Sequence, residues 1–155
     1  MSDQFDFISD TDKPALLAIT NPEWFSIAHL ALLEVGYKVH QIITHSDFPG
    51  RFSQVSYQLV IVEEEFGGNP VHENLTLQLL QRMPMNQRRH SIILLLGKSF
   101  QTLNTAQAFQ NSVHAVINYS EISWIAQIAQ KMVAENDLFL NNFREIQLRV
   151  AQAQK

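Results

Sequence analysis

The chain has 155 residues, a hydrophobic content of 46% and a formal net charge of −4, enough apolar material for one domain around one core. It contains no cysteine, which excludes disulfides, thiolate zinc sites and cysteine nucleophiles. The acidic balance lacks the basic footprint that nucleic acids require, and the apolar runs are far shorter than the roughly 20 residues that span a bilayer. The acidic N-terminus does not have the pattern of a secretory signal. We therefore expect a cytoplasmic protein that binds neither nucleic acid nor membrane.

Short strand-like runs alternate with helical stretches from Pro14 onward. The strand-like runs are residues 15–19, 37–44, 59–62, 91–96 and 115–117. The branched apolar run at 59–62 is typical of a central strand that is buried on both faces. Asn21-Pro22-Glu23 predicts the start of a helix, with Asn as N-cap and Pro in the first turn, and Gly36 ends that helix.

Further helices are expected between these strands. A poorly patterned one follows the second strand and is interrupted by Pro49-Gly50, and two others cover 71–83 and 101–111. Residues 120–155 contain no Gly or Pro and predict one long helix. This alternation predicts an α/β, flavodoxin-like doubly wound sheet of five parallel strands with an extended C-terminal helix. The expected organisation is an N-terminal leader over 1–13, a domain over 14–135 and a helical extension over 136–155.

Four segments carry a resemblance to a known family. They are Asn21-Pro22-Glu23, Gly36-Tyr37, Gln58–Glu63 and Ala115–Tyr119. In their order and spacing they resemble the receiver domain of two-component response regulators, the CheY-like family, over roughly residues 14–135. The resemblance implies the strand order 2-1-3-4-5 and a phosphorelay site at the carboxyl edge of the sheet.

The residues at that expected site depart from the family pattern. An active receiver needs carboxylates for Mg²⁺, an aspartate nucleophile, and a lysine that offsets phosphoryl charge. The resemblance puts Ile19 and Thr20 at the acidic pair, Glu63 at the phosphoacceptor, Leu96 at the switch hydroxyl, and Asn118 and Tyr119 at the Lys-Pro pair. A register one residue later would put Thr20 and Asn21 at the acidic pair, which still supplies no carboxylate. We therefore expect no phosphoryl transfer, no enzymatic activity and no cofactor.

Glu63 has two interpretations. Its carboxylate could imitate a phosphorylated aspartate and lock the domain in an activated-like state. Alternatively, Glu63, Glu64 and Glu65 are solvated acids at the end of a strand, which is the commoner case. None of the six histidines has the helical spacing of a zinc site, so no metal site is expected either.

The last predicted helix carries an apolar heptad stripe with spacings of four and three. Its positions are Ile125, Ala129, Met132, Asn136, Phe139, Phe143, Ile146 and Val150. Asn136 falls on an a-type position, where a buried polar residue tends to fix register and a dimeric state. We expect a homodimer. The alternative is that the second half folds back or frays, which Leu138 and Leu140, both off the stripe, would favour.

The sequence thus favours a pseudo-receiver that works as a protein–protein interaction module for a signalling partner or for itself. The surface formed by 101–111, the fifth strand and the last helix carries the candidate interface. Its candidate residues are Phe100, Tyr119, Trp124, Ile125, Met132, Asn136, Phe139 and Phe143. Two alternatives stay open: a small-ligand sensor at the carboxyl edge of the sheet, and an atypical receiver with a residual response to phosphate or metal.

Overall fold

The computed structural model describes residues 12–88 and 90–154 and contains one parallel sheet. Its strands are β1 (Lys13–Ala18), β2 (Tyr37–Ile42), β3 (Leu59–Glu63), β4 (Ile92–Gly97) and β5 (Ala115–Asn118). Their order is β2-β1-β3-β4-β5, and every pairing is parallel. The predicted doubly wound fold and strand order are confirmed. Most of the expected leader lies outside the described residues, and Lys13, its last residue, already belongs to β1.

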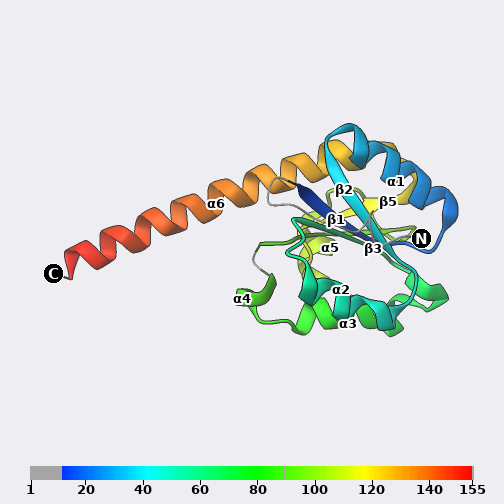
Figure 1. The fold of residues 1–155 in the computed structure, drawn as a ribbon, viewed down its shortest axis with the longest axis horizontal. Helices are drawn as coiled ribbons and strands as arrows, with labels where there is room; N and C mark the ends of the chain where they lie inside the picture. The colour runs from blue at the N-terminus through cyan, green and yellow to red at the C-terminus, as the bar shows by residue number, and fades with distance from the viewer. Residues whose placement is uncertain (1–11, 89, 155) are drawn as a thin grey trace.

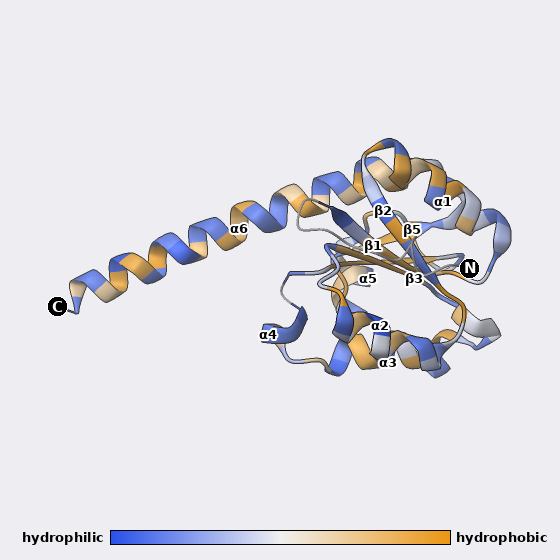
Figure 2. Ribbon diagram, viewed as in Figure 1, coloured by the Kyte–Doolittle hydropathy of each residue, from blue (hydrophilic) through white to orange (hydrophobic). Residues whose placement is uncertain are grey.

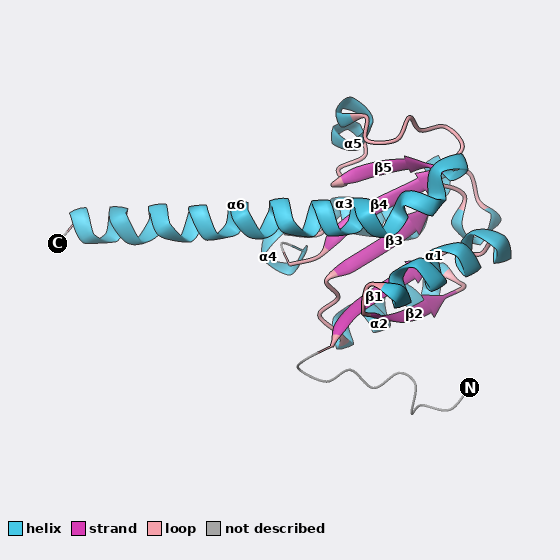
Figure 3. Cartoon of the chain, turned by 90° about the horizontal axis from the view of Figure 1, so that it is seen from above, coloured by secondary structure: helices cyan, strands magenta, loops and turns pink. Residues whose placement is uncertain are grey.

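Helices cover both faces of the sheet (Figures 1 and 3). They are α1 (Pro22–Glu34), α2 (Phe48–Gln54), α3 (Leu75–Arg82), α4 (Met85–Arg88), α5 (Thr105–Gln110) and α6 (Ile125–Ala153). α1 and α6 lie on one face, where Ala28 and Ile125 pack against apolar side chains of the strands. α2, α3 and α5 cover the other face, with Phe48 and Leu80 in a second apolar cluster. The domain is therefore a three-layer α/β/α sandwich.

Asparagine side chains set the helix starts. Asn21 accepts a hydrogen bond from the Trp24 amide (3.1 Å), as predicted for the N-cap of α1. Asn74 and Asn104 cap α3 and α5 in the same way. The helices expected from residues 71 and 101 therefore begin later, because each cap adopts an extended backbone conformation.

Two other helix predictions were wrong in detail. Pro49-Gly50 does not interrupt the second helix but lies in the first turn of α2, where a missing proline amide costs no hydrogen bond. The last helix does not begin at Ser120. A 3-10 segment, Tyr119–Trp124, comes first and contains a non-helical Glu121. The α-helix starts at Ile125.

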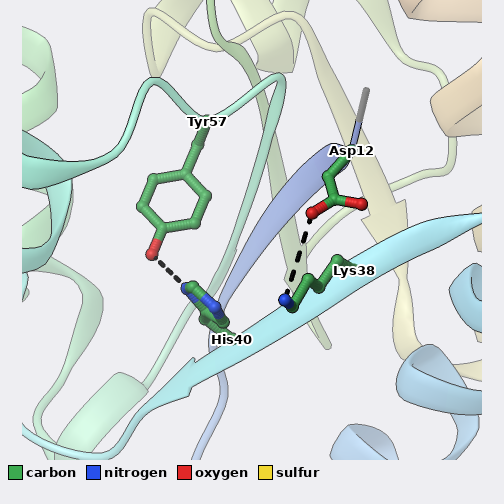
Figure 4. Close-up of polar contacts among 4 residues, drawn as sticks. All are labelled: Asp12, Lys38, His40 and Tyr57. Atoms are coloured by element: carbon green, nitrogen blue, oxygen red, sulfur yellow. Dashed lines mark hydrogen bonds and ion pairs between the residues drawn. The ribbon is translucent and has the colours of Figure 1, made fainter. Parts of the chain in front are cut away.

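A buried polar pair connects β2 to the loop before β3 (Figure 4). The Tyr57 hydroxyl and His40 Nδ1 lie 2.6 Å apart, and both side chains are almost wholly buried. Nearby on β2, Lys38 faces Asp12 at 4.0 Å. The hydrogen bond satisfies two polar atoms inside the core and links the edge strand β2 to the centre of the domain.

α6 is longer than the sheet that it covers. It spans 29 residues without a break, and its second half extends away from the body (Figures 1 and 2). The alternative that the extension folds back is therefore wrong. Its exposed side chains include Phe139, Phe143 and Ile146, which mix with polar residues along the free half. None of the described helices combines the length and the hydropathy needed to cross a membrane.

His114, just before β5, predicts how stability depends on pH. Its Nδ1 accepts a hydrogen bond from the Ile93 amide (3.0 Å), which only an unprotonated nitrogen can do. Although the residue as a whole is exposed, the ring is partly buried by its hydrogen bond to Ile93 and its packing, and this burial together with the positive charge of Arg88 lowers the pKa of His114 to about 4 from 6.5. The folded state therefore favours neutral His114, so its contribution to stability is complete above pH 6.5 and is lost as the pH falls toward about 4.

We expect urea unfolding to give a lower free energy of unfolding at pH 5 than at pH 7. In His114→Gln this difference should be smaller, because the titrating group is gone while an acceptor remains. An identical pH dependence in the wild type and in His114→Gln would contradict the assignment.

Candidate functional site

The carboxyl edge of the sheet brings together the predicted site residues. In the sheet register Glu63 lies beside Leu96, and Gly97 lies beside Asn118. Ile19 and Thr20 directly follow β1. Loops at this edge of a doubly wound sheet form the usual binding crevice of the fold. The structure therefore brings Ile19, Thr20, Glu63, Leu96 and Asn118 to the same edge of the sheet.

Glu63 is buried, with 6% of its surface exposed, and it points toward the loop between β1 and α1. Its Oε1 accepts three hydrogen bonds: from the Thr20 amide (2.8 Å), the Thr20 hydroxyl (3.0 Å) and the Asn21 amide (3.2 Å). These amides precede α1, whose positive dipole end also favours an anion. The extra methylene of glutamate gives the carboxylate this reach. Glu63 thus links β3 to the start of α1.

Glu64 forms the matching link on the other side. It is 7% exposed, and its Oε1 accepts hydrogen bonds from the amides of Lys98 (3.1 Å) and Ser99 (3.2 Å) after β4. Its own amide donates to the Leu96 carbonyl (2.7 Å). The interpretation of Glu63 and Glu64 as solvated acids was therefore wrong. Only Glu65 is exposed.

Asn74 binds the backbone of the two acids, a role that was not predicted from the sequence. Its side chain is fully buried. Its amide donates to the carbonyls of Glu63 (2.9 Å) and Glu64 (3.1 Å), while its Oδ1 accepts from the Leu77 amide (3.0 Å). One side chain thus caps α3 and fixes the end of β3. A cap-type residue before an apolar helix was the only signal that could have pointed to it.

His45 connects the next loop to the same region. Its Nδ1 accepts a hydrogen bond from the Thr76 amide (3.2 Å), and its Nε2 lies 2.9 Å from the Phe66 carbonyl. The pair is consistent with a neutral ring that carries its proton on Nε2. On the sequence alone His45 was considered only as a possible metal ligand, and this contact was missed.

Asn118 and Tyr119 also have structural partners at the edge. The side-chain Nδ2 of Asn118 donates to the carbonyls of Phe100 (2.8 Å) and Lys98 (3.3 Å), which anchors the loop after β4 to the end of β5. The Tyr119 ring stacks on Trp24 of α1, with centroids 5.2 Å apart. A small cavity of about 90 Å³ remains between Asn21, Trp24, Glu63–Glu65 and Gly97–Lys98.

Comparison with solved structures shows which known fold the chain adopts. The fold resembles a protein of Chloroflexus aurantiacus described as a response regulator, with a TM-score of 0.62 and 12% identity over 80% of this chain and 99% of that one. It also resembles an orphan response regulator of H. pylori (TM-score 0.57, 15% identity, 77% and 95% coverage). A third neighbour is a response regulator of Hahella chejuensis (0.54, 15%, 83% and 96%). The fold is that of a CheY-like receiver. No protein-family model matches the sequence, and comparison with curated proteins gives no significant match.

The donor groups do not fit the Mg²⁺ of an active receiver. Ile19 is buried and apolar and Thr20 offers only a hydroxyl, so neither supplies a carboxylate. The Oε1 atoms of Glu63 and Glu64 already accept backbone amides. Among residues 12–88 and 90–154, no group of three or more His, Asp or Glu side chains is placed to hold a metal ion. Leu96, at the position of the receiver hydroxyl, is wholly buried.

The candidate interface residues divide into two groups. Phe100 and Ile125 are buried in the core and cannot act as surface contacts, so that part of the prediction is corrected. Trp124, Phe139 and Phe143 are exposed. Tyr119 is 40% exposed, and Met132 and Asn136 are half-buried. Whether the accessible residues bind a partner stays a prediction.

A groove of about 570 Å³ lies between α5, β5 and α6. α5 and β5 contribute Phe109 and Ala115, and α6 contributes Lys131, Met132 and Glu135. Phe109, on its rim, is 86% exposed. An apolar side chain this open, next to a groove, is typical of a protein contact surface.

Gly97 offers a test of the buried Glu64 contact. A Cβ at position 97 would come within 2.5 Å of Glu64 Cβ and would also overlap Glu64 Oε1. We expect Gly97→Ala to lower the free energy of unfolding by about 1–3 kcal/mol, the usual cost of overpacking. Gly50→Ala is the matched control, because a Cβ there meets nothing within 4 Å. In helix α2 this change should stabilise by up to about 1 kcal/mol. Chemical denaturation measures both, and equal effects would contradict the packing described.

Proposed function

We propose that this chain is a non-catalytic receiver that works by binding proteins, itself included, rather than by accepting a phosphoryl group. The observation that carries the proposal is the use of Glu63 and Glu64. Both carboxylates serve as acceptors for the amides of neighbouring loops, where an active receiver keeps acids available for metal and phosphate. The site residues have thereby become structural.

The geometry favours this proposal over the activated-like alternative. By the resemblance, the switch hydroxyl that would respond to a phosphoryl group falls on Leu96, at the end of the fourth strand. Here the Glu63 carboxylate points the other way, toward Thr20 and Asn21, and Leu96 has no hydroxyl to respond. Tyr119 is already held against Trp24. Little remains at this edge that could sense the Glu63 charge.

The size of the edge cavity bears on the small-ligand alternative. Ligand pockets generally have volumes of about 300–1,000 Å³. The cavity beside Glu63 and Glu64 has a volume of about 90 Å³, room for a few waters at most. Larger apolar hollows lie away from this edge: one of about 560 Å³ beside α2, α3 and α4, and one of about 570 Å³ on the α5–β5–α6 side. Exposed apolar side chains continue along α6. Protein contact is the use that this distribution of surfaces supports best.

The first experiment tests the absence of phosphoryl transfer. The full chain is mixed with Mg²⁺ and acetyl phosphate, and the amides of Thr20, Asn21, Lys98 and Ser99 are followed by NMR. These amides donate to the two carboxylates, so a metal or phosphoryl group at the edge would shift their resonances. We expect no shift and no gain of mass. A phosphorylated side chain, or Mg²⁺-dependent shifts of these four amides, would overturn the proposal.

The second experiment tests the binding part of the proposal. Sedimentation of the full chain over a range of concentrations should show reversible self-association. Because the receiver site takes no part in the contact, acetyl phosphate with Mg²⁺ should leave the association constant unchanged. Association that requires the phosphodonor would instead indicate a working receiver switch.

A further inference from the structure

The heptad stripe of α6 has two different environments along one helix. Its first positions, Ile125 and Ala129, are fully buried against the sheet, and Met132 packs beside them. Its later positions are between 45% and 64% exposed: Phe139, Phe143, Ile146 and Val150. The same stripe therefore holds α6 to the body and then continues, uncovered, along the free half.

Because the stripe is continuous, its exposed positions on the free half point to the side of α6 on which the body lies. An α-helix drifts by only about 20° per heptad relative to a seven-residue repeat. Ala129 and Phe143 are two heptads apart, so their directions differ by about 40°. Phe143 thus faces the side of α6 on which the sheet lies. A helix that covered Phe139–Val150 would have to lie on that side, just beyond the end of the body.

This placement conflicts with a parallel pairing of two copies. In a parallel coiled coil the stripes face each other at equal heights, with Asn136 opposite Asn136 of the second copy. Each body would then occupy the space in front of the other copy's Ala129 and Met132, which its own sheet already fills. Helices in such a pair lie only about 10 Å apart. The two bodies would overlap.

An antiparallel pairing removes the conflict. One register places Phe143 of one copy opposite Ile146 of the second, and Phe139 opposite Val150 of the second. The two-fold symmetry of the pair repeats each of these contacts with the copies exchanged. Each layer then joins a large side chain to a smaller one, whereas the parallel arrangement would stack Phe on Phe. Asn136 lies opposite Ala153, at the end of the contact. The two bodies lie at opposite ends, on either side of an overlap about 26 Å long.

We propose that a second copy of this chain covers the free half of α6 in this antiparallel register. The proposal rests on the self-association proposed above and specifies its geometry. In this register Gln154, just after the helix end of each copy, lies opposite Glu135 of the other, which lines the groove beside α5. Each α6 end would thereby extend the contact from the stripe to the α5–β5–α6 side of its partner.

Matched substitutions on α6 test the surface. Ile146 is on the stripe and 58% exposed, whereas Leu148 is off the stripe and 64% exposed. Both are aliphatic residues on the free half, so neither substitution should disturb the body. In sedimentation of the full chain, Ile146→Ala should weaken the dimer by on the order of 10-fold. Leu148→Ala should change the association constant by less than about 2-fold. Equal effects, or a chain that stays monomeric throughout, would overturn the proposal.

Spin labels test the orientation. The sequence has no cysteine, so Gln130→Cys and Ala151→Cys each give a single labelled site, and both positions are exposed. In the antiparallel register the two copies of site 130 are about 44 Å apart along the helix axis, and the two copies of site 151 about 20 Å apart. A parallel pair would give nearly equal short distances, about 10–20 Å, at both sites. Short distances at site 130 would reject the antiparallel geometry. They would not affect the proposed function, which is tested by the effect of acetyl phosphate and Mg²⁺ on the association constant.

Discussion

Two buried carboxylates hold together the edge of this domain. Glu63 accepts amides from the loop before α1, and Glu64 accepts amides from the loop after β4, while Asn74 binds the carbonyls of both. A buried charge is costly unless it is fully hydrogen-bonded, and bonds to a charged acceptor contribute about 1.5–3 kcal/mol. The three loops that form the crevice are therefore tied to one strand end.

These hydrogen bonds distinguish the edge of this domain from the edge of a working receiver. A working receiver needs an edge that changes when charge arrives, and here the acids are part of the scaffold. Asn118 adds to the rigidity by bonding the loop after β4 to the end of β5. The surfaces that remain accessible, the groove beside α5 and the free half of α6, are formed by α5, β5 and α6 and do not include the two acids.

The fold was predictable from local signals. β1, β3, β4 and β5 contain apolar runs of the right length, whereas β2 alternates polar and apolar residues. Asn21-Pro22 marks the start of α1 because asparagine caps a helix and proline fits its first turn. The site was only partly predictable. The sequence located Glu63, yet the direction of a side chain and the burial of Glu64 depend on loops that are distant along the chain. Asn74 was missed for the same reason. The stripe on α6 was found from the spacing of its residues alone. The side of α6 on which the sheet lies could not be predicted in this way, because it depends on how the helix packs on strands that are distant along the chain. That side decides how two stripes can meet.

The contact between Gly97 and Glu64 has an evolutionary consequence. Cβ and Oε1 of Glu64 lie where any side chain at position 97 would stand, so position 97 cannot take a larger residue while the backbone keeps this geometry. Shortening the acid would not be enough to make room, because its Cβ would remain in place. Related sequences that keep the same loop after β3 should accordingly retain glycine at position 97.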